Sequence, residues 1–173
     1  MSFIVDTSRF QPISEIDGGD DEETALLQRL ADDAEAYVRS LSWAPPVEQM
    51  FLAFGIGGIL GLFLVRFVRP VARSQDQEFW IVVGDLPNAY GSVEDTPTPR
   101  VALEFYCYAM EDWAKQVLSG GDLSQVYPLK VEPTEEHANM LLSRIEFIRT
   151  EFIPVADKGP VFGGDAEQAP AND

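Results

Sequence analysis

The sequence has few of the residues from which metal and catalytic centres are usually built. Its 173 residues include one cysteine and one histidine. A single cysteine excludes an internal disulfide and fits a reducing compartment. A single histidine excludes a site with several histidine ligands. We therefore expect no metal and no cofactor, and the composition favours a protein that is not an enzyme.

Basic residues are also scarce, with 12 lysines and arginines against 29 acidic residues and a formal net charge of −17. Binding to nucleic acid or to anionic lipid depends on basic side chains, so neither partner is expected. An acidic surface keeps a protein soluble and attracts basic partners. The charge therefore predicts a basic protein as the partner, if the chain has one.

The sequence lacks an apolar run long enough to cross a bilayer comfortably. The uncharged run at 50–65 has 16 residues, whereas a membrane helix needs about 20. The start of the chain lacks the basic and apolar regions of a secretory signal. We therefore predict a cytoplasmic protein, in which 46–58 is a short helix or a loop with glycine hinges. The alternative is a single span of the inner membrane through 50–65.

Strand patterns follow that segment. Residues 59–69 and 78–84 are rich in β-branched and aromatic residues, and a polar stretch separates them. This arrangement predicts an antiparallel hairpin. A short third strand at 89–94 would extend the hairpin to a three-stranded meander.

Three amphipathic helices are predicted by their start and stop signals. The first begins at Asp20 and ends before Pro45, the second runs from Thr98 to Gly120, and the third runs from Thr134 to Pro154. The first helix has a predicted buried stripe of Leu26, Leu30, Ala34, Tyr37 and Leu41. The second has a stripe of Leu103, Tyr106, Met110, Trp113 and Val117.

These elements predict an α+β fold, a hairpin or three-stranded meander packed against three amphipathic helices. The predicted organisation is an irregular lead-in at 1–19, a single domain at 20–156 and a flexible acidic tail at 157–173. A length of 173 residues suits one domain.

Three features that resemble functional motifs have structural explanations. A dinucleotide-binding loop starting at Gly55 would need glycine at position 60, which is Leu60. Cys107 lies on the predicted core face of its helix, which favours a buried, inert thiol. His137 lies in the first turn of the third helix, where an exposed side chain without a catalytic partner is expected.

The most distinctive segment is 80–90, Trp-Ile-Val-Val-Gly-Asp-Leu-Pro-Asn-Ala-Tyr. A strand leads there into a rigid corner, because Asp85 can accept hydrogen bonds from turn N–H groups and Pro87 restricts the backbone. The corner redirects the chain towards the helix at Thr98. As a recognition loop it would present Asp85, Asn88 and Tyr90, with Glu94 nearby.

This segment also carries a family resemblance. The pattern W-x-V-V-G-D-L-P-x-A-Y at 80–90, the Thr-Pro-x-Pro at 96–99 and the Pro-Thr-Glu-Glu at 133–136 resemble a family of small bacterial proteins of unknown function. The resemblance covers roughly 35–153. It implies a bacterial cytosolic domain rather than a membrane anchor, and it implies no activity, cofactor or catalytic residue.

Two functional hypotheses follow. The first is a non-enzymatic acidic module that binds a basic protein, for example as an antagonist or an immunity-type partner. The second is an enzyme with a carboxylate-based site near Asp85, with Tyr90 and Glu94 close by.

Overall fold

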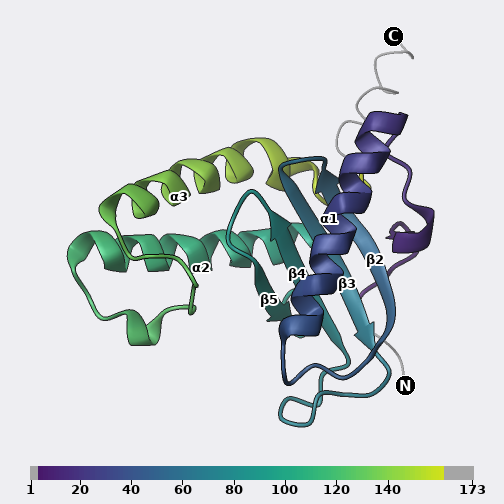
Figure 1. Cartoon of the computed structure of the whole chain (residues 1–173), viewed down its shortest axis with the longest axis horizontal. Coiled ribbons are helices and arrows are strands. Elements are labelled where there is room, and N and C mark those ends of the chain that lie inside the picture. The colour runs from purple at the N-terminus through teal and green to yellow at the C-terminus, as the bar shows by residue number, and fades with distance from the viewer. Residues whose placement is uncertain (1–3, 162–173) are drawn as a thin grey trace.

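The computed structural model describes residues 4–161 as an antiparallel sheet with helices on both faces (Figure 1). The five strands lie in the order β1-β2-β3-β4-β5, which is also their order along the chain. They are β1 (Gln11–Pro12), β2 (Val47–Ile56), β3 (Leu60–Phe67), β4 (Glu78–Gly84) and β5 (Ala89–Ser92). The α+β class is confirmed.

The sheet contains the predicted strands and two more. The hairpin at 59–69 and 78–84 is present as β3 and β4, and the short third strand is present as β5. A three-stranded meander is therefore part of the sheet, which β2 and the two-residue β1 extend at the other edge. A strand as short as β1 has no period that a sequence pattern can display.

The prediction of a helix or loop at 46–58 is wrong, because most of this segment is β2. Strand β2 pairs with β3 through a tight turn in which Ile56 lies opposite Leu60. Helices cover both faces of the strand, so its apolar residues form a continuous run without alternation. Gly55 permits a close approach to α1, since a Cβ there would lie 2.9 Å from the Leu27 side chain.

The strand structure of this segment also concerns the alternative prediction of a membrane span. Residues 50–65 lie in β2, β3 and the turn between them. Within residues 4–161, no helix has the length and the apolar character needed to cross a membrane.

Helix α1 (Asp21–Ser40) covers one face of the sheet, in front of the strands in Figure 1. Its N-cap is Asp20, whose carboxylate accepts a hydrogen bond from the Glu23 N–H at 2.7 Å. The predicted stripe is only partly right, because Leu26 and Tyr37 are half-buried. The buried residues are Leu27, Leu30, Ala31, Ala34 and Val38.

Helices α2 (Pro99–Ser119) and α3 (Glu135–Phe147) pack together on the opposite face. Both begin as predicted, with Thr98 and Thr134 as N-caps. Gly120 ends α2 in the left-handed conformation at φ 71°. A π-helical segment, Ile148–Phe152, and a 3-10 turn, Ile153–Val155, continue α3 to the predicted end near Pro154.

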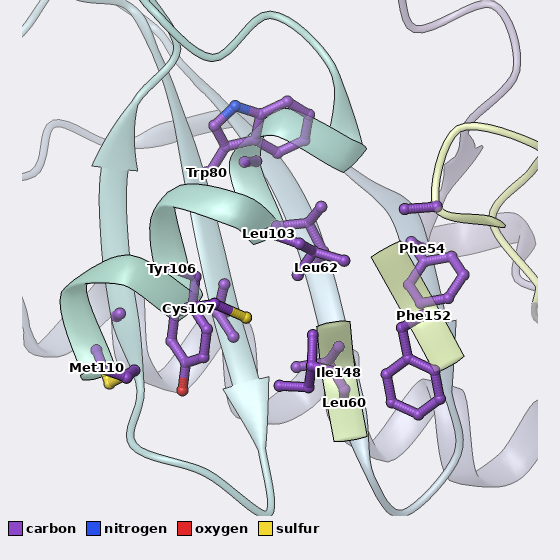
Figure 2. Packing of buried hydrophobic residues seen from close by; sticks show 14 of the residues in the cluster. Phe54, Leu60, Leu62, Trp80, Leu103, Tyr106, Cys107, Met110, Ile148 and Phe152 are labelled. Carbon is purple, nitrogen blue, oxygen red and sulfur yellow. The ribbon is translucent and has the colours of Figure 1, made fainter. Parts of the chain in front are cut away.

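The hydrophobic core has two halves, one on each side of the sheet. Phe63, Val65 and Phe67 face α1, whereas Leu60, Leu62 and Leu64 face α2 and α3. Figure 2 shows the second half, with Leu103, Tyr106, Cys107 and Met110 of α2 against Trp80 and Leu62 of the sheet. The predicted core face of α2 is confirmed for these positions.

Segments near both ends of the described chain contact the sheet. The buried Glu78 carboxylate accepts hydrogen bonds from the N–H groups of Ile4 and Val5 and pairs with Arg66 at 2.7 Å. The Gly55 N–H donates to the Pro160 carbonyl at 2.7 Å. The predicted lead-in at 1–19 includes β1, and the part of the predicted tail beyond residue 161 lies outside the described residues.

Candidate binding site between strand β5 and helix α2

A cavity of about 290 Å³ lies between the edge strand β5 and helix α2. We call it the β5–α2 cavity. Its walls come from β4, β5, the loop that follows β5, α2 and the loop after α2. The lining residues are Trp80, Val82, Ala89, Tyr90, Gly91, Ser92, Asp95, Thr96, Ala102, Phe105, Tyr106, Ala109, Met110 and Tyr127.

The cavity exists because small residues face one another across it. In β5, Ala89 pairs with Val82 and Gly91 pairs with Trp80, so both small residues lie on the face towards α2. A Cβ added at Gly91 would meet no atom within 4 Å. Helix α2 contributes Ala102 and Ala109 to the opposite wall. Neither wall therefore supplies the side chain that would fill the space.

Hydrogen bonds fix the walls in place. The Trp80 indole N–H donates to the Thr96 carbonyl at 2.6 Å, and the Thr96 hydroxyl donates to the Ser92 carbonyl at 2.7 Å. The Tyr106 hydroxyl donates to the Pro87 carbonyl at 2.8 Å. These polar groups are satisfied by the protein itself, so the cavity offers a mainly apolar, pre-formed surface, as ligand sites commonly do.

The rim of the cavity combines apolar and acidic groups. Phe105 lines the cavity although 56% of the residue is exposed, and Tyr108 on the next turn is 66% exposed. Asp95 is the one charged residue among the described residues that line the cavity. Glu94 beside it is also exposed.

Tyr127 closes the cavity at the free edge of β5. Its hydroxyl accepts a hydrogen bond from the Tyr90 N–H at 3.0 Å and donates to the Tyr90 carbonyl at 3.4 Å. Burial raises the pKa of Tyr127, against hydrogen bonds with Tyr90 and Tyr37 that lower it. Burial likewise raises the pKa of Tyr37 and Tyr106. These hydroxyls are therefore protonated at neutral pH and serve as structural hydrogen-bonding groups.

The four predicted site residues do not converge on one site. Asp85 lies in a separate groove of about 310 Å³ beside α3, whereas Tyr90 contributes to the β5–α2 cavity. The Tyr90 ring packs on Trp43 on the α1 face, at 4.8 Å between ring centroids. Asn88 and Glu94 are exposed and line neither space.

The groove at Asp85 brings the β4–β5 corner next to two residues of α3 that are distant from it in the sequence. Asp85 forms an ion pair with Arg144, which also donates to the Asp85 carbonyl at 3.2 Å, and His137 lines the same groove. The Asp85 side chain is 63% exposed. Its backbone N–H donates to the Ile59 carbonyl at 2.9 Å, so the residue links the β4–β5 corner to the β2–β3 turn as well as to α3.

The single cysteine and the single histidine have structural environments. Cys107 is fully buried, as predicted, and burial raises the pKa of its thiol to about 12, so the reactive thiolate is suppressed. His137 is half-buried rather than exposed, and its Nδ1 lies 2.9 Å from the Glu132 carbonyl oxygen. Within residues 4–161, no group of His, Cys, Asp and Glu side chains is arranged to hold a metal ion.

Sequence reasoning missed most of the cavity. Phe105 carried a usable signal, because it is a large aromatic residue between the stripe positions Leu103 and Tyr106. Gly91 and Tyr127 carried none, since their roles depend on what the fold places opposite them.

The comparison with protein families confirms that the chain resembles a family of unknown function. A family described as Domain of unknown function (DUF4826) matches residues 63–151, a little over half of the chain. The chain belongs to this DUF4826 family. No curated protein and no solved structure matches it significantly.

The DUF4826 match covers a defined part of the fold. It begins within β3 and ends within the π-helical segment, so it excludes α1 and β2. Every residue lining the β5–α2 cavity, and every residue lining the groove at Asp85, lies inside the match. Both spaces therefore belong to the part of the chain that defines the family.

Proposed function

We propose that this DUF4826 protein is a non-enzymatic module that binds a basic protein partner through the β5–α2 cavity. The observation that carries the proposal is the pre-formed apolar cavity itself, walled by aromatic residues and left unfilled by Ala89 and Gly91. A buried apolar pocket that receives one large side chain is a common anchor of protein interfaces.

Charge supports a basic partner. The chain has a net charge of −17, and Asp95 lines the cavity while no lysine or arginine of the described residues does so. Complementary charge around an apolar anchor speeds association and rejects acidic competitors. A cytoplasmic antagonist or immunity-type partner is the form of this proposal that the acidic charge and the single cysteine favour.

The experiment compares capture by two matched variants. Gly91→Leu places a leucine side chain in the cavity, and Ala36→Leu adds the same side chain to the exposed surface of α1, on the other side of the sheet. We expect the wild type and Ala36→Leu to retain the same protein from a lysate of the source organism at physiological salt, and Gly91→Leu to lose it. Equal capture by all three forms would contradict the proposed site.

A second candidate function is an enzyme with a carboxylate-based site at Asp85. The observation that favours it is that Asp85, His137 and Arg144 line one groove. The ion pair with Arg144 opposes it, because a general base has to be free to accept a proton. Loss of a measurable turnover in Asp85→Asn, with binding by the β5–α2 cavity intact, would favour the enzyme.

A further inference from the structure

Strand β5 is the last strand of the sheet, and no strand pairs with its outer edge within residues 4–161. An edge strand presents backbone N–H and C=O groups that a further strand can bond. In β5 these groups are occupied by side chains instead. The Tyr127 hydroxyl bonds both the N–H and the C=O of Tyr90, and the Thr96 hydroxyl donates to the Ser92 carbonyl.

The Tyr127 hydroxyl therefore occupies the position that a residue of a neighbouring strand would take. A paired strand supplies one acceptor and one donor to such a residue, and a single hydroxyl can do both. The bond to the Tyr90 carbonyl is long, at 3.4 Å, so this side of the arrangement is weak. A backbone segment would satisfy the same two groups with better geometry.

The β5–α2 cavity lies directly beside this edge. Its floor includes Ala89 and Gly91, which point towards α2, and its far wall is α2 itself. In an added strand, alternate side chains point to the same face as Ala89 and Gly91. One apolar side chain of such a strand would thus be directed into the cavity, while its flanking residues would lie near Glu94 and Asp95.

We propose that an extended segment of the basic partner adds to β5 as a sixth strand, displaces the Tyr127 hydroxyl and inserts one large apolar side chain into the β5–α2 cavity. This inference rests on the proposed function and specifies its binding mode. Strand addition obtains affinity from backbone hydrogen bonds and specificity from a pocket beside the edge, and β5 with its cavity offers both.

The test uses the full chain and a synthetic peptide, acetyl-Lys-Lys-Thr-Phe-Thr-Lys-Lys-amide. Its lysines meet the acidic surroundings, and its phenylalanine is the anchor. Two control peptides separate the contributions. One has N-methyl groups on the phenylalanine and on the following threonine, which blocks backbone pairing in either register. The other has serine in place of phenylalanine.

We expect calorimetry to show binding of the parent peptide. Each control peptide should bind at least about tenfold more weakly than the parent peptide. Gly91→Leu should abolish binding and Ala36→Leu should preserve it. Tyr127→Phe removes the competing hydroxyl, so it should bind the parent peptide about threefold to tenfold more tightly. Amide resonances of β5 should shift with the parent peptide in nuclear magnetic resonance spectra.

Other outcomes overturn the inference. Equal affinity for the parent and N-methylated peptides would contradict strand addition. The cavity would then bind a side chain only, and the proposed function would stand. Absence of binding at about 1 mM parent peptide would also contradict strand addition. A dimer in sedimentation experiments that Gly91→Leu converts to a monomer would assign the edge to a second copy of the chain. Equal capture by Gly91→Leu, as described above, would instead remove the proposed function itself.

Discussion

At the scale of single residues, two glycines of the β4–β5 region have opposite roles. Gly91 leaves open space on the face of β5 towards α2, whereas Gly84 has a φ of 138° and a Cβ there would lie against the Ile59 carbonyl. Glycine in a strand interior is unfavourable unless its conformation or the space requires it. At position 84 both the backbone conformation and the lack of space require glycine, whereas at position 91 neither does.

The first prediction concerns these glycines. Gly91→Leu should keep or raise the free energy of unfolding, by up to about 1 kcal/mol, because a leucine improves strand propensity and fills apolar space. Gly84→Leu should lower it by about 2–5 kcal/mol through backbone strain and overlap with the neighbouring strand. Urea unfolding measures both. A large loss of stability in Gly91→Leu would mean that the cavity is not available to a side chain.

The second prediction concerns the buried pair of Glu78 and Arg66. The Glu78 side chain is 3% exposed and also accepts from the N–H groups of Ile4 and Val5. Glu78→Leu should destabilise the protein by about 3–5 kcal/mol, because it leaves a half-buried guanidinium and two donors without this acceptor. Glu78→Gln keeps an acceptor and should cost less. Thermal unfolding measures the stability of the two variants. Equal losses of stability would contradict a role for the hydrogen bonds of Glu78.

At the scale of elements, the register of α1 on the sheet is the feature that can be tested most directly. Leu27 is fully buried against the sheet, whereas its neighbour Leu26 is half-buried. We predict that Leu27→Ala lowers the free energy of unfolding by about 2–5 kcal/mol, and that Leu26→Ala lowers it much less. Urea unfolding of this matched pair distinguishes the observed register from the sequence-based one, in which Leu26 is the core residue.

A second element-scale prediction concerns the attachment of the π-helical segment to α2. Arg149 donates to Glu111 at 2.7 Å, and this hydrogen bond lowers the pKa of Glu111 below its ordinary value of 4.5. The pair therefore contributes stability above about pH 4.5, and the contribution disappears as the pH falls through the lower folded-state pKa. Glu111→Gln should be less stable than the wild type at pH 7, with the difference shrinking towards pH 3 in thermal unfolding. A constant difference would exclude the ionic contribution.

The helices were predictable because their ends carry local chemistry. Thr98 and Pro99, and then Thr134 with two glutamates, mark starts that no tertiary contact needs to create. Strand β2 was not predictable in the same way. Its glycines resemble hinges, and its continuous apolar run becomes a strand only because helices cover both faces of the sheet.

Only a small part of the candidate site could be predicted from the sequence. The corner at Asp85 stands out in the sequence, and the structure places it in a groove with Arg144, a partner 59 residues away. The β5–α2 cavity is a space rather than a set of polar residues. It depends on small residues in both walls, such as Gly91 in β5 and Ala109 in α2, and on Tyr127 reaching the edge of β5 from a distant loop.

At the scale of the whole molecule, the large negative charge should determine how salt affects thermal stability. A net charge of −17 on 173 residues implies repulsion among surface carboxylates at neutral pH. We predict that adding about 0.5 M sodium chloride at pH 7 raises the midpoint of thermal unfolding, because the salt screens this repulsion. If the chain binds a basic protein as proposed, the same salt should weaken capture of that protein. A lower midpoint in salt would mean that attractive ion pairs outweigh the repulsion.

The three tryptophans of the chain lie in separate environments. Trp80 lines the β5–α2 cavity, Trp43 packs on Tyr90 at the opposite face of the sheet, and Trp113 is buried within the helical layer. The indole of Trp80 is thus a built-in optical reporter at the site, since its emission responds to any group that enters the cavity beside it. With Trp43 and Trp113 changed to phenylalanine, one fluorophore would follow occupancy of the cavity directly, with no label attached to the protein.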